Sequence, residues 1–146
     1  MSSSTMAQRA KFVGAQTNRL RLLVAEDDVP LRTLIVRHLR LEGFDVDEAA
    51  SGDLALDLIT HALLTHPPRP YDLLITDVRM PGTTGLEVLG AIRELDWHTP
   101  VIVITGFGDK EAHDEAARLG ACALFDKPFD LDDLGTAVVN ALPTSR

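Results

Sequence analysis

The chain has 146 residues, which is enough for one compact core and too short for two ordinary domains. Its apolar share of 45% and charged share of 25% are those of a soluble globular protein, and no stretch approaches the ~20 continuous apolar residues that a membrane span needs. A formal net charge of -8 would repel a phosphate backbone, which argues against nucleic-acid binding by this chain.

The first 19 residues are predicted to be a disordered leader. They are rich in serine, threonine and glutamine, and they lack the apolar core of a secretory signal. A mis-assigned start upstream of Met6 explains them equally well. The single cysteine, Cys122, excludes an internal disulfide and is expected to be a small buried residue. We therefore expect a cytoplasmic protein with one domain over residues 20–142 and a short tail at 143–146.

Five short apolar runs rich in branched residues predict buried strands. In chain order they are residues 22–25, 46–49, 73–76, 101–104 and 121–125. Apolar residues at helical spacing follow each run, which predicts helices around 31–39, 54–62, 84–95, 110–119 and 131–138. The (βα)₅ alternation predicts an α/β fold: a doubly wound, parallel, five-stranded sheet with helices on both faces.

The segment at 65–70 interrupts this pattern. Its three prolines cannot continue the preceding helix, so we expect an exposed loop. His61 and His66 lie in or near it, but they have no further partner at a spacing that would bind a metal. The sequence assigns this loop no role.

Acidic residues gather where strands end. Glu26 and Asp27 follow the first strand directly, and Asp77 follows the third. Ligands of open α/β sheets bind beyond the carboxyl ends of the strands, so these carboxylates are expected to meet there. An all-oxygen cluster of this kind repels itself unless a hard cation such as Mg²⁺ neutralises it. Asp28, by contrast, is better explained as the N-cap of the next helix.

Two further polar residues lie at the ends of the fourth and fifth runs. Thr105 follows the fourth run, and Lys127 follows the fifth and precedes Pro128. A carboxylate nucleophile, a hydroxyl, an ammonium group and a metal ion can together attack and then hold a phosphoryl group. Neither Thr105 nor Lys127 alone would indicate phosphoryl-transfer chemistry.

The ordered combination of these motifs resembles the receiver domains of bacterial response regulators. The segments that carry the resemblance are LLVAEDD at 22–28, DLLITDVRMPGTTGLE at 72–87, VIVITG at 101–106 and FDKPF at 125–129. It spans about residues 20–142. It implies the flavodoxin-like strand order 2-1-3-4-5, which agrees with ligand binding at the strand ends.

The resemblance also implies roles for individual residues. Asp77 would form the acyl phosphate, and Glu26 and Asp27 would hold Mg²⁺ together with Asp77 and the backbone carbonyl of Arg79. Lys127 would contact the phosphoryl oxygens. Such a domain is not an enzyme in the ordinary sense, because it catalyses only its own phosphorylation and dephosphorylation.

Partners are implied in the same way. The phosphoryl donor would be a sensor histidine kinase or a histidine phosphotransfer protein. Thr105 would turn toward the new phosphate and change the face formed by the fourth helix, the fifth strand and the fifth helix. A downstream protein, or a second copy of the chain, would bind that face.

Three positions depart from the family pattern. The family usually has an aromatic residue three positions before the lysine, which swings inward with the threonine. Leu124 stands there, and Phe125 follows it. The first acid of the pair is Glu26 rather than aspartate, and the loop at 65–70 is several residues longer than usual.

Three alternatives compete with this interpretation. A haloacid-dehalogenase-type hydrolase would need a second aspartate where Arg79 stands, and room for a cap domain. A dinucleotide fingerprint beginning at Gly106 fails, because Glu111 occupies the position of its third glycine. The third is a receiver-like docking or dimerisation module that does not use phosphorylation. Leu124 favours this module, whereas Asp77, Thr105 and Lys127 speak against it.

Overall fold

A computed structural model describes residues 19–65, 71–95, 98–106 and 108–142 of the chain. Its five strands are β1 (Arg21–Ala25), β2 (Asp45–Ala49), β3 (Leu73–Asp77), β4 (Val101–Thr105) and β5 (Ala123–Asp126). All neighbouring strands are parallel, in the order β2-β1-β3-β4-β5. The predicted fold class and strand order are both confirmed.

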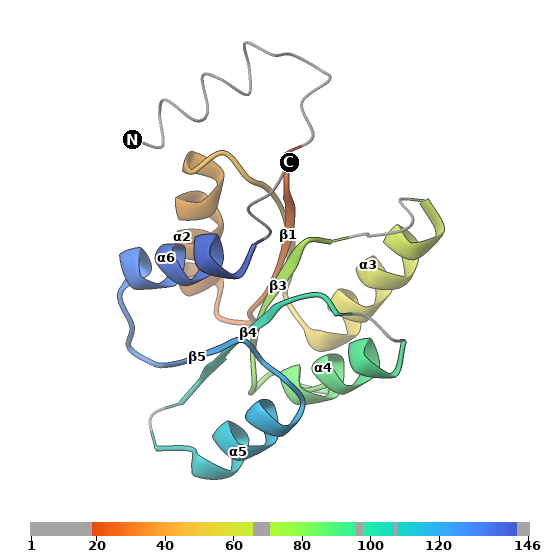
Figure 1. The fold of residues 1–146 in the computed structure, drawn as a ribbon, viewed down its shortest axis with the longest axis vertical. Helices are drawn as coiled ribbons and strands as arrows, with labels where there is room; N and C mark the ends of the chain where they lie inside the picture. The colour runs from red at the N-terminus through yellow and green to blue at the C-terminus, as the bar shows by residue number, and fades with distance from the viewer. Residues whose placement is uncertain (1–18, 66–70, 96–97, 107, 143–146) are drawn as a thin grey trace.

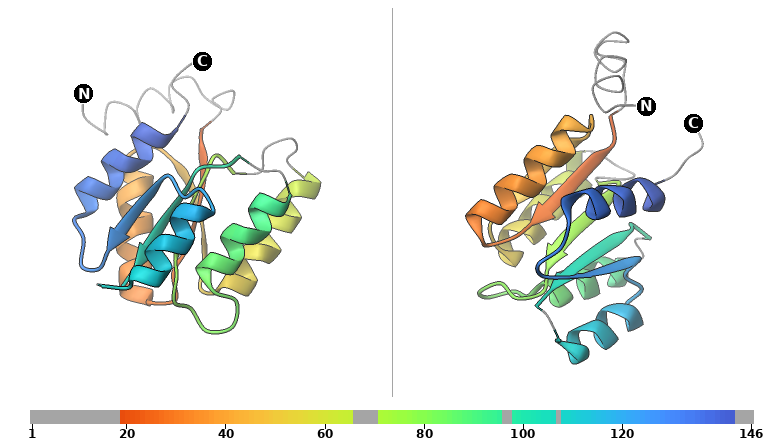
Figure 2. Two further views of the ribbon diagram at one scale, coloured as in Figure 1. Left: turned by 60° about the horizontal axis from the view of Figure 1, so that its bottom comes forward. Right: turned by 90° about the vertical axis from the view of Figure 1, so that its left-hand side faces the viewer.

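Five helices cover the two faces of this sheet (Figures 1 and 2). They are α2 (Val29–Leu41), α3 (Gly52–Thr65), α4 (Gly85–Glu94), α5 (Lys110–Arg118) and α6 (Leu131–Ala141). Helices α2 and α6 lie on one face, and α3, α4 and α5 lie on the other. None of the helices in the described ranges is long and apolar enough to cross a membrane.

Alternation along the strands builds two separate cores. Leu22 and Val24 of β1 pack under α2 and α6, whereas Leu23 and Ala25 pack under the other three helices. Strands β3 and β4 are buried along their whole length. A central parallel strand is covered on both faces, which explains why these runs are continuously apolar rather than alternating.

Helix starts lie at the same edge of the sheet as the strand ends. The Asp28 side chain accepts a hydrogen bond from the Leu31 N–H at 3.5 Å, so its predicted role as an N-cap is confirmed. Thr84 and Glu87 form a reciprocal capping box at the start of α4. Caps of this kind fix where each loop ends, and so position the loops around the carboxylates.

The structure differs from the sequence predictions at the start of β5. The strand begins at Ala123 rather than at residue 121, and Cys122 is exposed rather than buried. Cys122 follows α5, where its N–H donates to the Val101 carbonyl and its side chain is exposed. The predicted leader, apart from Arg19, and the predicted tail lie outside the described residues, as does most of the loop at 65–70.

Candidate functional site

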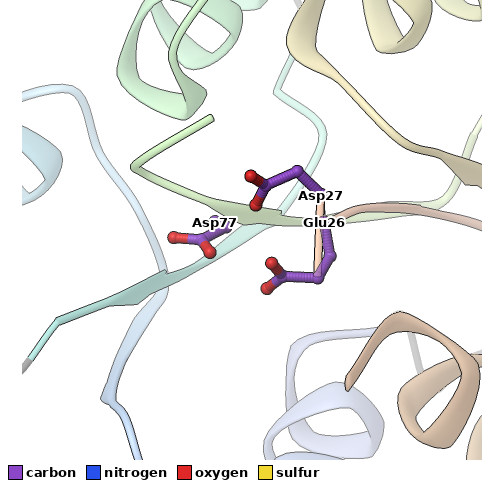
Figure 3. Close-up of side chains that lie close together, drawn as sticks. All are labelled: Glu26, Asp27 and Asp77. Atoms are coloured by element: carbon purple, nitrogen blue, oxygen red, sulfur yellow. The ribbon is translucent and has the colours of Figure 1, made fainter. Parts of the chain in front are cut away.

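The acidic residues from two neighbouring strands meet at the carboxyl edge of the sheet. Strand β1 pairs with β3 so that Ala25 lies beside Thr76, which brings Glu26 and Asp27 next to Asp77. One carboxylate oxygen from each of the three lies within 4.8 Å of the others. Figure 3 shows the three side chains leaving the ends of the two strands and gathering in one place. The predicted acidic cluster is therefore present.

Glu26 is the most deeply buried of the three acids. Its side chain is 1% exposed, and its Oε2 accepts a hydrogen bond from the Asp28 N–H at 3.0 Å. Among the described residues, no donor forms a hydrogen bond with Oε1, and the Lys127 Nζ lies 3.4 Å from it. Burial raises the pKa of Glu26 to about 7, and the neighbouring Asp77 adds to the increase.

Asp77 is held from two sides. Lys127 Nζ donates to Asp77 Oδ2 at 2.6 Å, and the backbone N–H of Arg79 donates to Oδ1 at 3.1 Å. Burial by itself would lower the pKa of Lys127, but the hydrogen bond to Asp77 and the charges of Asp77 and Glu26 outweigh it and raise that pKa. The ammonium group therefore stays charged between the two buried carboxylates.

Thr105 ends β4, the strand beside β3. It is fully buried, and its hydroxyl donates to the Gly106 carbonyl at 3.3 Å. Its own carbonyl accepts a hydrogen bond from the Lys127 N–H at 2.8 Å. The structure thus brings together Glu26, Asp27, Asp77 and Lys127, with the backbone of Arg79. In the structure described, the Thr105 hydroxyl donates to the neighbouring Gly106 carbonyl rather than to a residue of the acidic cluster.

The donor set suits a small, hard cation. It consists of carboxylate oxygens, which Mg²⁺ prefers, and two of the carboxylates are buried while that of Asp27 is exposed. A buried carboxylate oxygen without a hydrogen-bond donor is costly, and a cation near Glu26 Oε1 would remove that cost. The residues present therefore fit Mg²⁺.

Two close backbone contacts position the loop after Asp77. A Cβ on Gly85 would lie 2.0 Å from the Asp77 carbonyl oxygen, and a Cβ on Gly52 would lie 2.1 Å from the Thr83 carbonyl oxygen. The Thr83 hydroxyl also donates to the Asp53 carboxylate. Glycine at these two positions lets α4 and α3 approach the loop closely, and so fixes the backbone around the acidic cluster.

Two side-chain contacts near the site were not foreseen from the sequence. Arg79 Nη2 lies 2.5 Å from Asp109 Oδ2, and His113 Nε2 lies 2.6 Å from Asp126 Oδ1. The Ala112 N–H, followed by the Arg79 guanidinium, holds the pKa of Asp109 below its usual range. The sequence signal for Asp109 is its position before a helix. No local pattern indicates His113.

Comparison with known proteins places these features in a family. A family model described as "Response regulator receiver domain" matches residues 22–139. Sporulation initiation phosphotransferase F of Bacillus subtilis is 34% identical over 123 residues, which are 84% of this chain and 94% of that protein. Regulatory protein AtoC of Escherichia coli is 35% identical over 122 residues, which are 84% of this chain but 25% of that longer protein.

Comparison with solved structures indicates the same family. A response regulator receiver domain protein from Clostridium thermocellum matches with a TM-score of 0.75 and 30% identity, over 84% of this chain and 93% of that one. Receiver domains are regulatory rather than ordinary enzymes, and they generally bind Mg²⁺ in an acidic pocket like the one formed here by Glu26, Asp27 and Asp77. The matched family model, the related sequences and the shared fold together show that this chain belongs to the response regulator receiver domains of two-component signal transduction.

Proposed function

We propose that this chain is a cytoplasmic, phosphorylatable switch in which Asp77 accepts a phosphoryl group. The donor would be the phosphohistidine of a sensor histidine kinase or of a histidine phosphotransfer protein. The observation that carries the proposal is the arrangement around Asp77: a carboxylate only 4% exposed, at the open edge of the sheet, between the Lys127 ammonium group and a second buried acid. The related phosphotransferase from Bacillus subtilis supports it.

The chemistry follows from these groups. A carboxylate oxygen of Asp77 attacks the phosphorus, the P–N bond to the histidine breaks, and the imidazole keeps the electron pair and takes up a proton. Glu26, Asp27, Asp77 and the Arg79 carbonyl would hold Mg²⁺, which when bound neutralises charge on the phosphoryl oxygens. Lys127, already 2.6 Å from Asp77 Oδ2, would move its hydrogen bond to a phosphoryl oxygen.

The output step would begin at Thr105. Its hydroxyl would leave the Gly106 carbonyl and donate to the phosphoryl group, which pulls the loop after β4 inward. The face formed by α5, β5 and α6 would then change its affinity for a downstream protein, an output domain or a second copy of the chain. A docking module that does not use phosphorylation is the competing function, since the shape of that face alone would serve it.

Mass spectrometry with a small phosphoryl donor separates these two functions. With acetyl phosphate and Mg²⁺, the wild-type chain should gain the mass of one phosphoryl group, and Asp77→Asn should gain none. Asp57→Asn is a matched control, because Asp57 is exposed on α3, far along the chain from the acidic cluster. Its adduct should equal that of the wild type. A wild type without an adduct, or an equal adduct on Asp77→Asn, would contradict the proposal.

Replacing Lys127 tests the competition between the ammonium group and the metal. Lys127→Met removes a cation that is 32% exposed, so the effect is discounted for solvent screening. We expect Mg²⁺ to bind about fivefold more tightly, equivalent to about 1 kcal/mol, and phosphorylation to slow. Calorimetric titration with Mg²⁺ measures the change. Lys110→Met, in an exposed pair with Asp114, should leave the affinity unchanged; weaker Mg²⁺ binding by Lys127→Met would refute the competition.

A further inference from the structure

Helix α5 is attached to the sheet by little apolar contact. Within its bounds it buries only Ala112 and Ala116, whereas α4 on the same face buries Val88, Leu89 and Ile92. Apolar stabilisation scales with the area removed from water, so two alanines hold a helix weakly. Polar contacts therefore account for a larger share of the attachment of α5 than of its neighbour.

The first polar contact ties the start of α5 to the loop after Asp77. The guanidinium of Arg79 contacts Asp109, and Asp109 is the N-cap of α5, because its Oδ1 accepts a hydrogen bond from the Ala112 N–H at 3.2 Å. The backbone N–H of Arg79 in turn donates to Asp77 Oδ1. A continuous series of contacts runs from the carboxylate of Asp77 to the first turn of α5.

The second contact ties the middle of α5 to the strand that carries Lys127. The imidazole of His113 lies 2.6 Å from the carboxylate of Asp126, the last residue of β5. Both side chains are about one-third exposed, at 34% and 38%. Lys127 follows Asp126 directly and donates to Asp77 Oδ2. A second series of contacts therefore joins the other oxygen of Asp77 to α5.

Leu124 provides an apolar contact between β5 and α5 beside these polar pairs. Leu124 lies next to Val103 in the sheet and packs in the same core as Ala112 and Ala116, so it does face α5. Phe125 points to the opposite core, where its ring meets Phe129 edge-on at 5.8 Å. The aromatic side chain that follows Leu124 in sequence is thus on the wrong side of the sheet to take part.

The far end of α5 is held by hydrogen bonds from α4. Arg93 of α4 donates from Nε to the Leu119 carbonyl at 2.9 Å and from Nη2 to the Gly120 carbonyl at 3.2 Å. A displacement of α5 would therefore pivot at its C-terminal end and be largest at its N-terminal end.

We propose that the Arg79–Asp109 and His113–Asp126 pairs are the connection through which a phosphoryl group on Asp77 displaces α5, in a chain where Leu124 replaces the aromatic relay. This inference rests on the proposed function of Asp77. A phosphoryl group places new negative charge beside Arg79 and takes over the hydrogen bond of Lys127. The first change acts on Arg79, which pairs with Asp109 at the start of α5. The second acts on Lys127, whose neighbour Asp126 pairs with His113, so the two pairs transmit both changes to the N-terminal half of α5.

Hydrogen exchange of the full chain tests the connection. Beryllofluoride with Mg²⁺ serves as the phosphoryl mimic, the ¹⁹F resonance of bound fluoride reports binding at Asp77, and mass spectrometry reports amide exchange in α5. The test variant is Asp109→Ser with His113→Ala. Serine retains the N-cap but not the charge that pairs with Arg79. Asp114→Asn is the control, since Lys110 and Asp114 form a pair on the same helix that reaches no strand.

In the wild type and in Asp114→Asn, we expect the mimic to change the exchange rates in α5 by about fivefold, the lower end of ordinary coupling between two sites. The double variant should bind the mimic and lose at least about half of that response. His113→Gln should restore the response relative to His113→Ala, because a glutamine amide can donate to Asp126 as the imidazole does. If the double variant does not fold, the comparison of His113→Ala with His113→Gln tests the inference in its place.

Three results would overturn the inference. One is a double variant whose α5 responds as the wild type does, and another is equal responses of His113→Ala and His113→Gln. The third is a wild type that binds fluoride at Asp77 without any change in α5. Absence of bound fluoride and of an acetyl phosphate adduct in the wild type is a different result, because it rejects the phosphorylation of Asp77 and with it everything downstream.

Discussion

Without Mg²⁺, Glu26→Gln should be more stable than the wild type by about 1–3 kcal/mol at pH 8. Burial moves the pKa of Glu26 from 4.5 to about 7, so the folded state favours the protonated carboxyl. Wild-type stability is therefore lost as the pH rises from 4.5 to about 7, and the full penalty remains above that pH. A neutral amide at position 26 avoids this penalty and can donate a hydrogen bond to Asp77.

Urea unfolding at pH 5 and pH 8, with and without Mg²⁺, measures the effect. The advantage of Glu26→Gln should shrink at pH 5, and it should disappear with saturating Mg²⁺, because the metal stabilises only the protein that binds it. Glu94→Gln, at an exposed position at the end of α4, should behave as the wild type under all four conditions. A Glu26→Gln protein that is less stable than the wild type at pH 8 without Mg²⁺ would contradict this account of the buried carboxylate.

Gly85→Ala should destabilise the fold by about 3 kcal/mol or more, or prevent folding. The new Cβ would lie 2.0 Å from the Asp77 carbonyl oxygen and 2.9 Å from Thr76 Oγ1. The nearer atom is backbone in a fully buried strand, so neither side can move without disturbing β3. Since the displaced residue is Asp77 itself, any protein that does fold should also accept less phosphoryl group from acetyl phosphate.

Gly90→Ala is the matched control in the same helix. A Cβ at Gly90 meets nothing within 4 Å, and alanine in a helix interior is better than glycine by up to about 1 kcal/mol. Gly90→Ala should therefore be neutral or stabilising in urea unfolding. Equal stability of Gly85→Ala and Gly90→Ala would show that the backbone beside Asp77 tolerates displacement.

The fold and most of the site could be predicted because strand ends in a parallel sheet share one edge. Once the five runs were recognised as strands, acids after the first and third runs had to lie close together, and the structure confirms this for Glu26, Asp27 and Asp77. Asp28 was predictable as a cap because capping depends on a residue's position at a helix start. These inferences need only local patterns and the topology.

The contacts that depend on exact side-chain placement could not be predicted. Arg79 and Asp109 are 30 residues apart, and nothing in the periodicity pairs them. The direction of the Thr105 hydroxyl, toward Gly106, depends on the rotamer in the structure described. Cys122 was wrongly expected to be buried, because residue type indicates average burial, whereas Cys122 lies just before the edge strand β5 and is exposed.

Borohydride trapping of the phosphorylated chain shows which residue accepts the phosphoryl group. Borohydride reduces an aspartyl phosphate to homoserine and leaves free aspartate unchanged, so peptide mass spectrometry after treatment with acetyl phosphate and Mg²⁺ locates the acceptor. We expect homoserine at position 77, dependent on Mg²⁺. Homoserine at another aspartate, or none in any peptide of a chain that is folded and has Mg²⁺ present, would contradict it.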